Sequence, residues 1–148
     1  MLDLENSSYN VVLRSHMDNI TDITYNQMLG KLVTVGEDYC VKVWHGETME
    51  QVNEFVSEND LPVRVVSQNQ GSLGEGVTSE DTDTLVAIGF KSGFLRILDL
   101  SEMKIVHETL LFQSPVMDIV FSLDNRFMAV FFRSGKIVIL NKERAGHF

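Results

Sequence analysis

Four side chains that could do chemistry stand in the first third of the chain: His16, Thr34, Asp38 and Trp44. A carboxylate such as Asp38 could serve in acid–base catalysis if it were taken alone. The Thr34 hydroxyl and the Asp38 carboxylate can also accept hydrogen bonds from a nearby indole or imidazole. A turn carboxylate that binds backbone amides and a histidine needs no reaction to explain it. We therefore favour a structural network over a catalytic site.

The residues around this group predict a β-hairpin. Residues 32–35 (LVTV) and 40–44 (CVKVW) are rich in β-branched and aromatic side chains, which favour strands. Between them, residues 36–39 (GEDY) supply the Gly and Asp that a tight turn needs. A further short strand is predicted over residues 19–25, just after His16.

In their order along the chain, His16, Thr34, Asp38 and Trp44 are similar to the structural tetrad of WD40 repeats. In that family the four side chains form a hydrogen-bonded chain that holds each blade together. The Asp that usually follows the Trp is replaced here by His45, while the tetrad itself is complete. The resemblance thus implies a structural role for all four residues.

The sequence also repeats itself. A shift of 96 positions lays residues 20–44 on 116–140 without a gap, and a shift of 54 lays 32–44 on 86–98. Val63 falls on Ile20 at a shift of only 43, which predicts an insertion of 11 residues in the second unit. Three residues then stand at equivalent places: Trp44, Leu98 and Leu140. A WD40 blade recurs every ~40–45 residues, so the chain holds three related units.

The later units lack the tetrad. At the Asp38 position they carry Ser92 and Ser134, and Phe112 stands where the third unit would have its His. At the Thr34 position they carry Ile88 and Val130. We therefore expect the second and third blades to depend on apolar packing rather than on a polar chain.

These patterns predict an all-β fold, a partial β-propeller of about three four-stranded antiparallel WD40-like blades. The predicted strands cover residues 9–14, 19–25, 32–35, 40–44, 51–56, 61–63, 85–89, 94–99, 104–111, 116–121, 127–132 and 136–140. No segment keeps apolar residues at helical spacing, so helix should be scarce.

The predicted divisions follow the repeats. Residues 1–15 form a lead-in and the outer strand of a preceding blade, 16–58 the first blade, 59–111 the second blade with an insertion loop at 69–83, and 112–148 a truncated third blade. Propellers close with ~4–8 blades, and three cannot close a ring. We therefore expect the remaining blades of a longer chain.

Composition excludes several classes of protein. The net charge of −9 argues against non-specific nucleic-acid binding, and no apolar run approaches the ~20 residues of a membrane-spanning helix. A single cysteine excludes a disulfide framework, and the N-terminus lacks a signal region, which together favour the cytoplasm. Three histidines lack zinc-site spacing, so we expect no metal and no cofactor: His45, His107 and His147.

Two groups of acidic residues are candidate partner-binding sites. Asp22 and Asp118 hold equivalent places in two opening strands, where the resemblance implies proximity to the central channel, and a structural hydrogen-bonding role is the alternative. The insertion carries four carboxylates that could dock onto a basic protein surface: Glu75, Glu80, Asp81 and Asp83. An insertion without function explains the second group equally well.

Basic residues gather instead in the third unit. They are Arg126, Arg133, Lys136, Lys142 and Arg144. Solvated strand ends account for them, and a site for an acidic peptide is the alternative.

The resemblance implies a non-catalytic protein–protein interaction scaffold that binds proteins or peptides, as part of a propeller in a larger protein or complex. Divergent tetrads, an acidic surface and a blade insertion resemble those of large multi-propeller proteins of cilia and centrioles, which suggests a cytoskeletal location. Two alternatives remain open. A propeller-supported enzyme would need convergent titratable residues, and an unrelated β-sandwich would not form separate four-stranded sheets.

Overall fold

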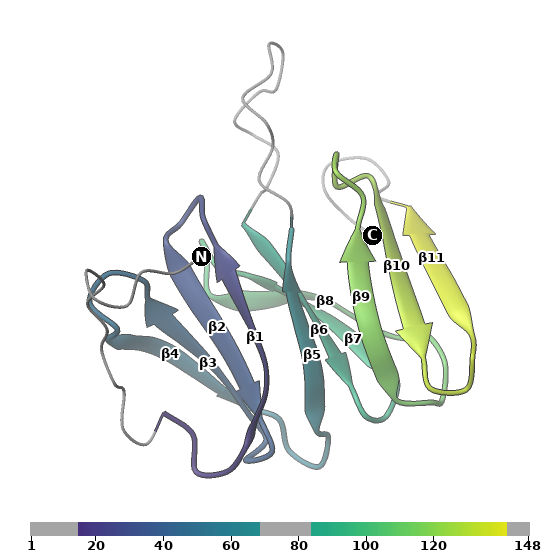
Figure 1. The fold of residues 1–148 in the computed structure, drawn as a ribbon, viewed down its shortest axis with the longest axis horizontal. Coiled ribbons are helices and arrows are strands. Elements are labelled where there is room, and N and C mark those ends of the chain that lie inside the picture. The colour runs from purple at the N-terminus through teal and green to yellow at the C-terminus, as the bar shows by residue number, and fades with distance from the viewer. Residues whose placement is uncertain (1–14, 69–83, 142–148) are drawn as a thin grey trace, which may run out of the picture.

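The computed structural model describes residues 15–68 and 84–141, and all regular structure in these two ranges is β-strand (Figure 1). The strands are β1 (Ile20–Asn26), β2 (Lys31–Gly36), β3 (Cys40–His45), β4 (Gln51–Val56), β5 (Pro62–Ser67), β6 (Leu85–Phe90), β7 (Phe94–Asp99), β8 (Lys104–Leu110), β9 (Val116–Phe121), β10 (Phe127–Phe132) and β11 (Ile137–Asn141). Four strands match their predicted bounds to the residue: β4, β7, β9 and β10.

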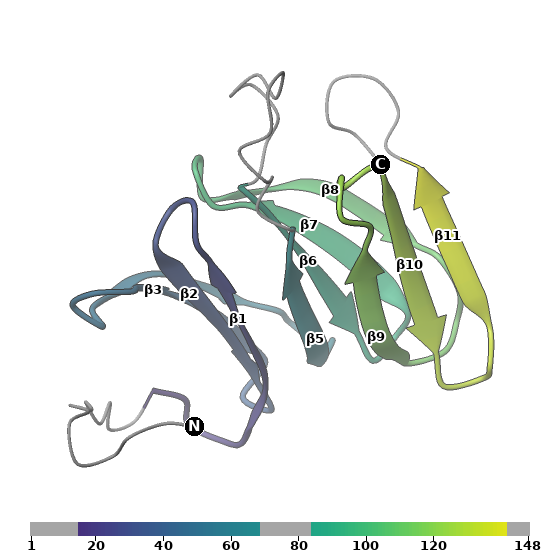
Figure 2. The same ribbon diagram turned by 45° about the horizontal axis from the view of Figure 1, so that its top comes forward.

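The strands form three separate antiparallel sheets in chain order. Two are four-stranded meanders, β1-β2-β3-β4 and β5-β6-β7-β8, and the third consists of β9, β10 and β11. The sheets stand side by side like blades, and the first strands of neighbouring sheets contact each other (Figure 2). The predicted all-β partial propeller is therefore confirmed. The predicted strand at residues 9–14 and the predicted insertion at 69–83 lie outside the described residues.

The three sheets repeat the same backbone hydrogen bond at one end. The N–H of the second turn residue donates to the carbonyl that precedes the first strand of the sheet, at 2.8–2.9 Å: Glu37 to Asn19, Lys91 to Leu61 and Arg133 to Pro115. A second backbone hydrogen bond, within the turn, is also shared. In each sheet the N–H of a residue with positive φ donates to the carbonyl three residues earlier; these residues are Tyr39, Gly93 and Gly135. The repeat is thus a property of the backbone.

Strand pairing corrects one alignment. Pro62 pairs with Phe90 as Ile20 pairs with Gly36, so the opening strands differ by 42 positions rather than the predicted 43. The insertion is accordingly 12 residues and not 11. The predicted alignment matched the apolar Val63 to the apolar Ile20, whereas in the structure Val63 is the bulge residue of β5 and corresponds to Thr21, the bulge residue of β1.

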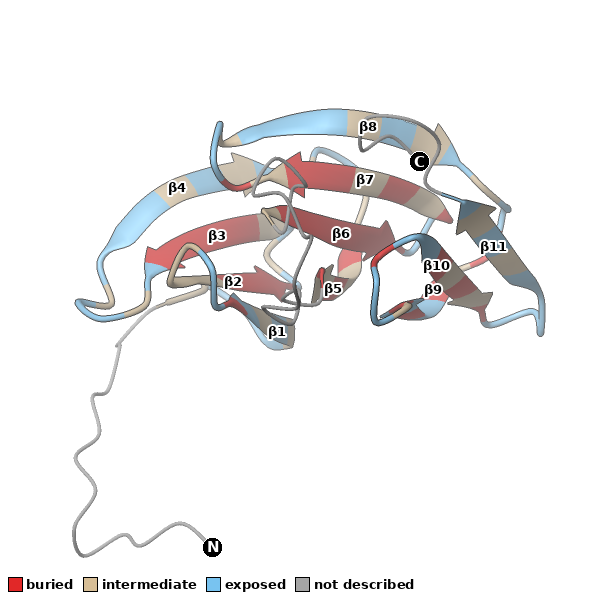
Figure 3. Cartoon of the chain, turned by 90° about the horizontal axis from the view of Figure 1, so that it is seen from above, coloured by how far each residue is buried: buried red, intermediate tan, exposed pale blue. Residues whose placement is uncertain are grey.

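The core lies between the sheets. One apolar cluster joins the first sheet to the second and includes Val43 and Ile88, and another joins the second to the third and includes Leu95 and Val130. The middle sheet is covered on both sides, so β6 is buried along its whole length. The outer strands β4 and β8 are largely exposed (Figure 3). Each fully buried apolar side chain stabilises the fold by about 1.5–3 kcal/mol.

Candidate functional site

The structure brings the four predicted tetrad side chains into one hydrogen-bonded chain. His16 Nδ1 lies 2.9 Å and 3.0 Å from the two carboxylate oxygens of Asp38. On its other side, His16 Nε2 lies 2.6 Å from Thr34 Oγ1, and Trp44 Nε1 donates to that same oxygen at 3.0 Å. The chain links the segment before β1 to β2, to β3 and to the turn between these two strands.

When the imidazole of His16 is neutral, the hydrogen-bond partners determine which atom carries each proton. Trp44 N–H donates to Thr34, the Thr34 hydroxyl donates to Nε2 of His16, and Nδ1–H of His16 donates to Asp38. Hydroxyl, imidazole and carboxylate also follow this order in hydrolase triads. Here, however, Thr34 is 3% exposed and its oxygen is occupied by the indole N–H. No substrate can reach the hydroxyl, so the chain holds the blade together.

Asp38 is held in its charged form. Burial raises its pKa, but the hydrogen bond from His16 and those from the backbone N–H groups of Met17 and Cys40 outweigh that effect, and the net pKa lies below the usual aspartate value. The neighbouring Cys40 has a pKa of about 11 because of burial, its hydrogen bond with Glu54 and the nearby carboxylates. It remains a neutral thiol at pH 7 and is a poor nucleophile.

Gly36 makes room for this chain. A Cβ atom at residue 36 would lie 2.8 Å from His16 Nδ1 and 2.9 Å from Asp38 Oδ1. Both contacts are shorter than real side chains tolerate, so any larger residue would push the imidazole and the carboxylate apart. The glycine before the turn is therefore part of the network.

The second blade has a polar network of its own, which corrects the expectation of purely apolar packing. Asp60, in the segment before β5, accepts hydrogen bonds from the Ser92 hydroxyl at 2.6 Å and from the Ser92 N–H at 3.2 Å. Arg96 Nη1 lies 3.4 Å from the same carboxylate, and its Nε donates to Glu108 at 2.7 Å. The Arg96 guanidinium also stacks 4.3 Å from the centre of the Phe90 ring. Sequence reasoning missed Asp60 and Arg96.

In the third blade, a single hydrogen bond to a side chain joins the turn to the segment before the first strand. Ser114, before β9, accepts a hydrogen bond from the Ser134 N–H at 3.1 Å. Phe112 does not replace the histidine of the first blade but packs edge-on against Phe132, with ring centres 5.8 Å apart. The expectation of mainly apolar packing therefore describes this blade better than the second.

The two described candidates for partner binding lie in different surroundings. Asp22 accepts a hydrogen bond from Val65 N–H at 3.0 Å and lies 3.9 Å from Arg64 Nη1, so it joins the first strands of two blades. Asp118 is exposed and accepts a bond only from the adjacent N–H of Ile119 among the bonds resolved for it. The other four candidates lie outside the described residues: Glu75, Glu80, Asp81 and Asp83.

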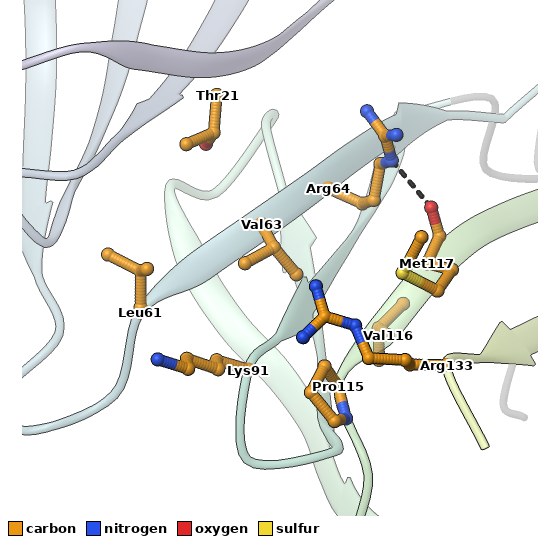
Figure 4. A pocket seen from close by; sticks show the side chains of 9 residues that line it. All are labelled: Thr21, Leu61, Val63, Arg64, Lys91, Pro115, Val116, Met117 and Arg133. Atoms are coloured by element: carbon orange, nitrogen blue, oxygen red, sulfur yellow. Dashed lines mark hydrogen bonds between the residues drawn. The ribbon is translucent and has the colours of Figure 1, made fainter.

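A cavity of about 340 Å³ opens where the three sheets meet, at the end that carries the shared turns (Figure 4). Each first strand contributes the residue at which its pairing register shifts: Thr21, Val63 and Met117. A bulge redirects the side chain of the extra residue. The repeated bulge thus turns one side chain from each sheet toward the same space.

Three cations surround this cavity, which we call the basic pocket: Arg64, Lys91 and Arg133. Arg64 lies on β5, whereas Lys91 and Arg133 hold equivalent places in the turns of the second and third sheets. Arg64 already makes a hydrogen bond within the fold, because its Nε donates to the Met117 carbonyl at 2.6 Å (Figure 4). Sequence reasoning grouped Arg133 with other third-unit cations and did not single out the other two.

Comparison with known proteins gives the family. No family model matches the chain. Curated relatives named WD repeat-containing protein 90 match it at 26% identity, from Xenopus tropicalis over 86% of this chain, Mus musculus over 93% and Homo sapiens over 86%. These matches support a WD40-repeat family for the chain. It spans only 6–7% of the length of these relatives.

The three sheets differ in how completely they carry the polar chain typical of WD40 blades. The first blade has all four side chains within hydrogen-bonding distance. The second uses Asp60, Ser92 and Arg96 instead. In residues 15–68 and 84–141, no group of three His, Cys, Asp or Glu side chains is arranged to hold a metal. No helix long and apolar enough to cross a membrane occurs in the same ranges.

Proposed function

We propose that this WD40 chain is a non-catalytic protein–protein interaction scaffold that binds its partner at the basic pocket. The observation that carries the proposal is the pocket's construction. Three sheets each supply a bulged side chain to one cavity of about 340 Å³, a volume suited to binding part of a ligand. The strands that bear these side chains are fixed by their sheets, so the site is preorganised for binding.

The side chains around the pocket favour binding over catalysis. They are cationic, apolar or, at Thr21, a hydroxyl, and none is a carboxylate or a histidine. The one His–Asp pair within the described ranges is the buried pair of the first blade. An enzyme with its site at the pocket would therefore lack a general base at neutral pH. The net charge of −9 also disfavours a nucleic-acid partner.

The experiment that tests the scaffold uses the natural full-length protein with a photo-crosslinking amino acid in place of Met117. This residue lines the pocket and is 43% exposed. Ile105 on the outer strand β8 is 38% exposed and provides the matched control site. Irradiation in cells should attach a protein to residue 117 and not to residue 105. Attachment at residue 105 alone would contradict the proposal.

The scaffold's place in the cell is the cytoplasm, at a cilium, a centriole or another cytoskeletal structure. This part of the proposal is supported only by the resemblance of the divergent blades and acidic composition to large multi-propeller proteins of such structures. Fluorescence imaging of the tagged full-length protein beside centriole and axoneme markers tests it. A diffuse distribution that detergent extraction before fixation removes would contradict it.

A further inference from the structure

Two cations of the basic pocket have no acidic partner within the described residues. No described carboxylate lies within 4.0 Å of the side-chain nitrogens of Lys91 or Arg133, and both residues are exposed. Arg64, in contrast, lies 3.9 Å from Asp22 and donates to a backbone carbonyl. Lys91 and Arg133 are therefore the two charges that an incoming ligand could neutralise.

These two charges stand over an apolar floor. Val63, Pro115 and Val116 line the pocket, and Val116 is 2% exposed. In Figure 4 the Arg133 guanidinium extends between Val63 and Pro115, and the Lys91 side chain extends toward Leu61 from the neighbouring turn. A ligand that fits both features carries negative charge beside an apolar group.

The charge of the whole chain narrows the class of ligand. The chain has 21 acidic and 12 basic side chains, so its field repels a long polyanion such as a nucleic acid. A short segment with a few carboxylates is attracted by the cations of the pocket. The acidic remainder of the chain repels it less than it repels a long polyanion. The planar guanidinium of Arg133 matches a carboxylate in a two-bond fork, whereas the ammonium of Lys91 offers a point charge.

We infer that the basic pocket binds an acidic segment of the partner protein, with carboxylates at Lys91 and Arg133 and an adjacent apolar side chain on Val63, Pro115 and Val116. This inference rests on the proposed scaffold function and names the chemistry of its partner. Arg64 positions Met117 at the rim of the pocket rather than anchoring the ligand, because its guanidinium already bonds the backbone there.

The test is binding of a labelled eight-residue peptide, seven Glu and one central Leu, to the natural full-length protein by fluorescence anisotropy. Lys91→Gln and Arg133→Gln should each weaken binding by about 3–10-fold, as expected for one charge-assisted contact at a solvent-accessible site. Lys104→Gln is the matched control, since Lys104 is an exposed cation on β8 and its loss changes the net charge equally. It should change binding less than twofold, by the salt-screened long-range effect alone.

Two further probes separate this inference from its rivals. A peptide with Gln in place of every Glu should bind at least about tenfold more weakly, since its carboxylates are gone. Equal binding of the two peptides, or equal effects of Lys104→Gln and Arg133→Gln, would overturn the acidic-segment inference. A serine-phosphorylated peptide without Glu that binds tenfold more tightly would also overturn it, in favour of a phosphopeptide.

The crosslinking experiment keeps the two proposals distinguishable. If residue 117 still attaches a protein in cells while the acidic peptide does not bind, the scaffold function stands and the acidic-segment inference falls. If Arg133→Gln abolishes that attachment and weakens the peptide, both are supported. Folding of each variant is checked by its thermal melt, which should match the wild type because both side chains are exposed.

Discussion

The first and second blades join the same turn to the same preceding segment with opposite polar chemistry. In the first, the preceding segment supplies the donor, His16, and the turn supplies the acceptor, Asp38. In the second, the preceding segment supplies the acceptor, Asp60, and the turn supplies the donor, Ser92. The backbone bond between the two parts is 2.8 Å long in both blades. The blade geometry is thus set by the backbone and the apolar core, and more than one side-chain network satisfies it.

The two networks differ in their exposure to water. The side chains of His16 and Asp38 are 1% and 7% exposed, whereas those of Asp60 and Arg96 are 12% and 21% exposed. A buried polar group that loses its partner bears the full cost of desolvation, while an exposed group exchanges its partner for water. Equivalent deletions should therefore cost more in the first blade than in the second.

The largest effect is expected at Thr34, the centre of the first network. Thr34→Val removes the acceptor of the Trp44 N–H and the partner of His16 Nε2 together. Because two buried groups lose a partner, we expect the free energy of unfolding to fall by about 2–4 kcal/mol. Urea denaturation followed by Trp44 fluorescence measures it.

Ile88 holds the Thr34 position in the second blade and provides the control. It is 1% exposed, and Ile88→Val removes one methylene group from the core without affecting a polar partner. This change should cost about 0.5–1.5 kcal/mol. A cost for Thr34→Val no greater than for Ile88→Val would contradict the importance of the first blade's polar chain.

The next effect is expected at the turn carboxylate itself. Asp38→Ala removes the acceptor of His16 Nδ1 and of two backbone N–H groups, which should cost about 1–3 kcal/mol. Ser92→Ala and Ser134→Ala change the equivalent positions of the other blades and should cost less, since both serines are exposed. Thermal melts of the three variants compare them, and equal losses would remove the distinction between the blades.

Much of the fold could be predicted from short-range pattern. The bounds of strands such as β4 and β9 are predicted correctly because in both places a short run that carries Val and Phe ends at Ser and turn residues. The register of β5 is predicted one residue off, because matching apolar residues pairs Val63 with Ile20, whereas Val63 holds the bulge position that the polar Thr21 holds in β1. A local pattern cannot reveal a bulge, which is defined by the partner strand.

The site could be predicted only in the first blade, where one repeat carries all four residue types of a known structural tetrad. His16, Thr34, Asp38 and Trp44 were singled out by type and order, and the structure places them within hydrogen-bonding distance. Asp60 is not predicted because the acceptor of the second blade lies in the segment before the first strand, whereas in the first blade it lies in the turn. The basic pocket escaped notice because its cations come from two blades and converge only when the sheets are assembled.

A smaller effect is expected in the second blade's network. Asp60→Ala leaves the Ser92 hydroxyl and Arg96 without their shared carboxylate, but both are close enough to solvent to regain hydrogen bonds. We expect a loss of about 0.5–1.5 kcal/mol. A double-mutant cycle of Asp60→Ala with Arg96→Met should give a coupling of about 0.5–1 kcal/mol. A coupling of zero would mean that the ion pair adds nothing beyond the stacking of Arg96 on Phe90.

The smallest effect is expected from the charge of Asp38 alone, which pH isolates. The folded-state pKa of Asp38 lies below the ordinary aspartate value of 3.8, so folding favours the ionised form. The resulting stability is fully present above that ordinary pKa and is lost as the pH falls through the lower, folded-state pKa. Asp38→Asn has no charge to lose. It should therefore reduce the acid-induced fall in stability between pH 5 and about pH 3, measured by urea denaturation at each pH.

Ser92→Ala is the control for this pH dependence, because it alters the equivalent turn without removing a carboxylate. It should retain the wild-type slope of stability against pH, while Asp38→Asn should flatten it. The flattening is partial, since Asp99 and Asp124 also have lowered pKa values and continue to titrate. If Asp38→Asn kept the full wild-type slope, the carboxylate would act in the first blade only as a hydrogen-bond acceptor. The first and second blades would then differ in burial and not in charge.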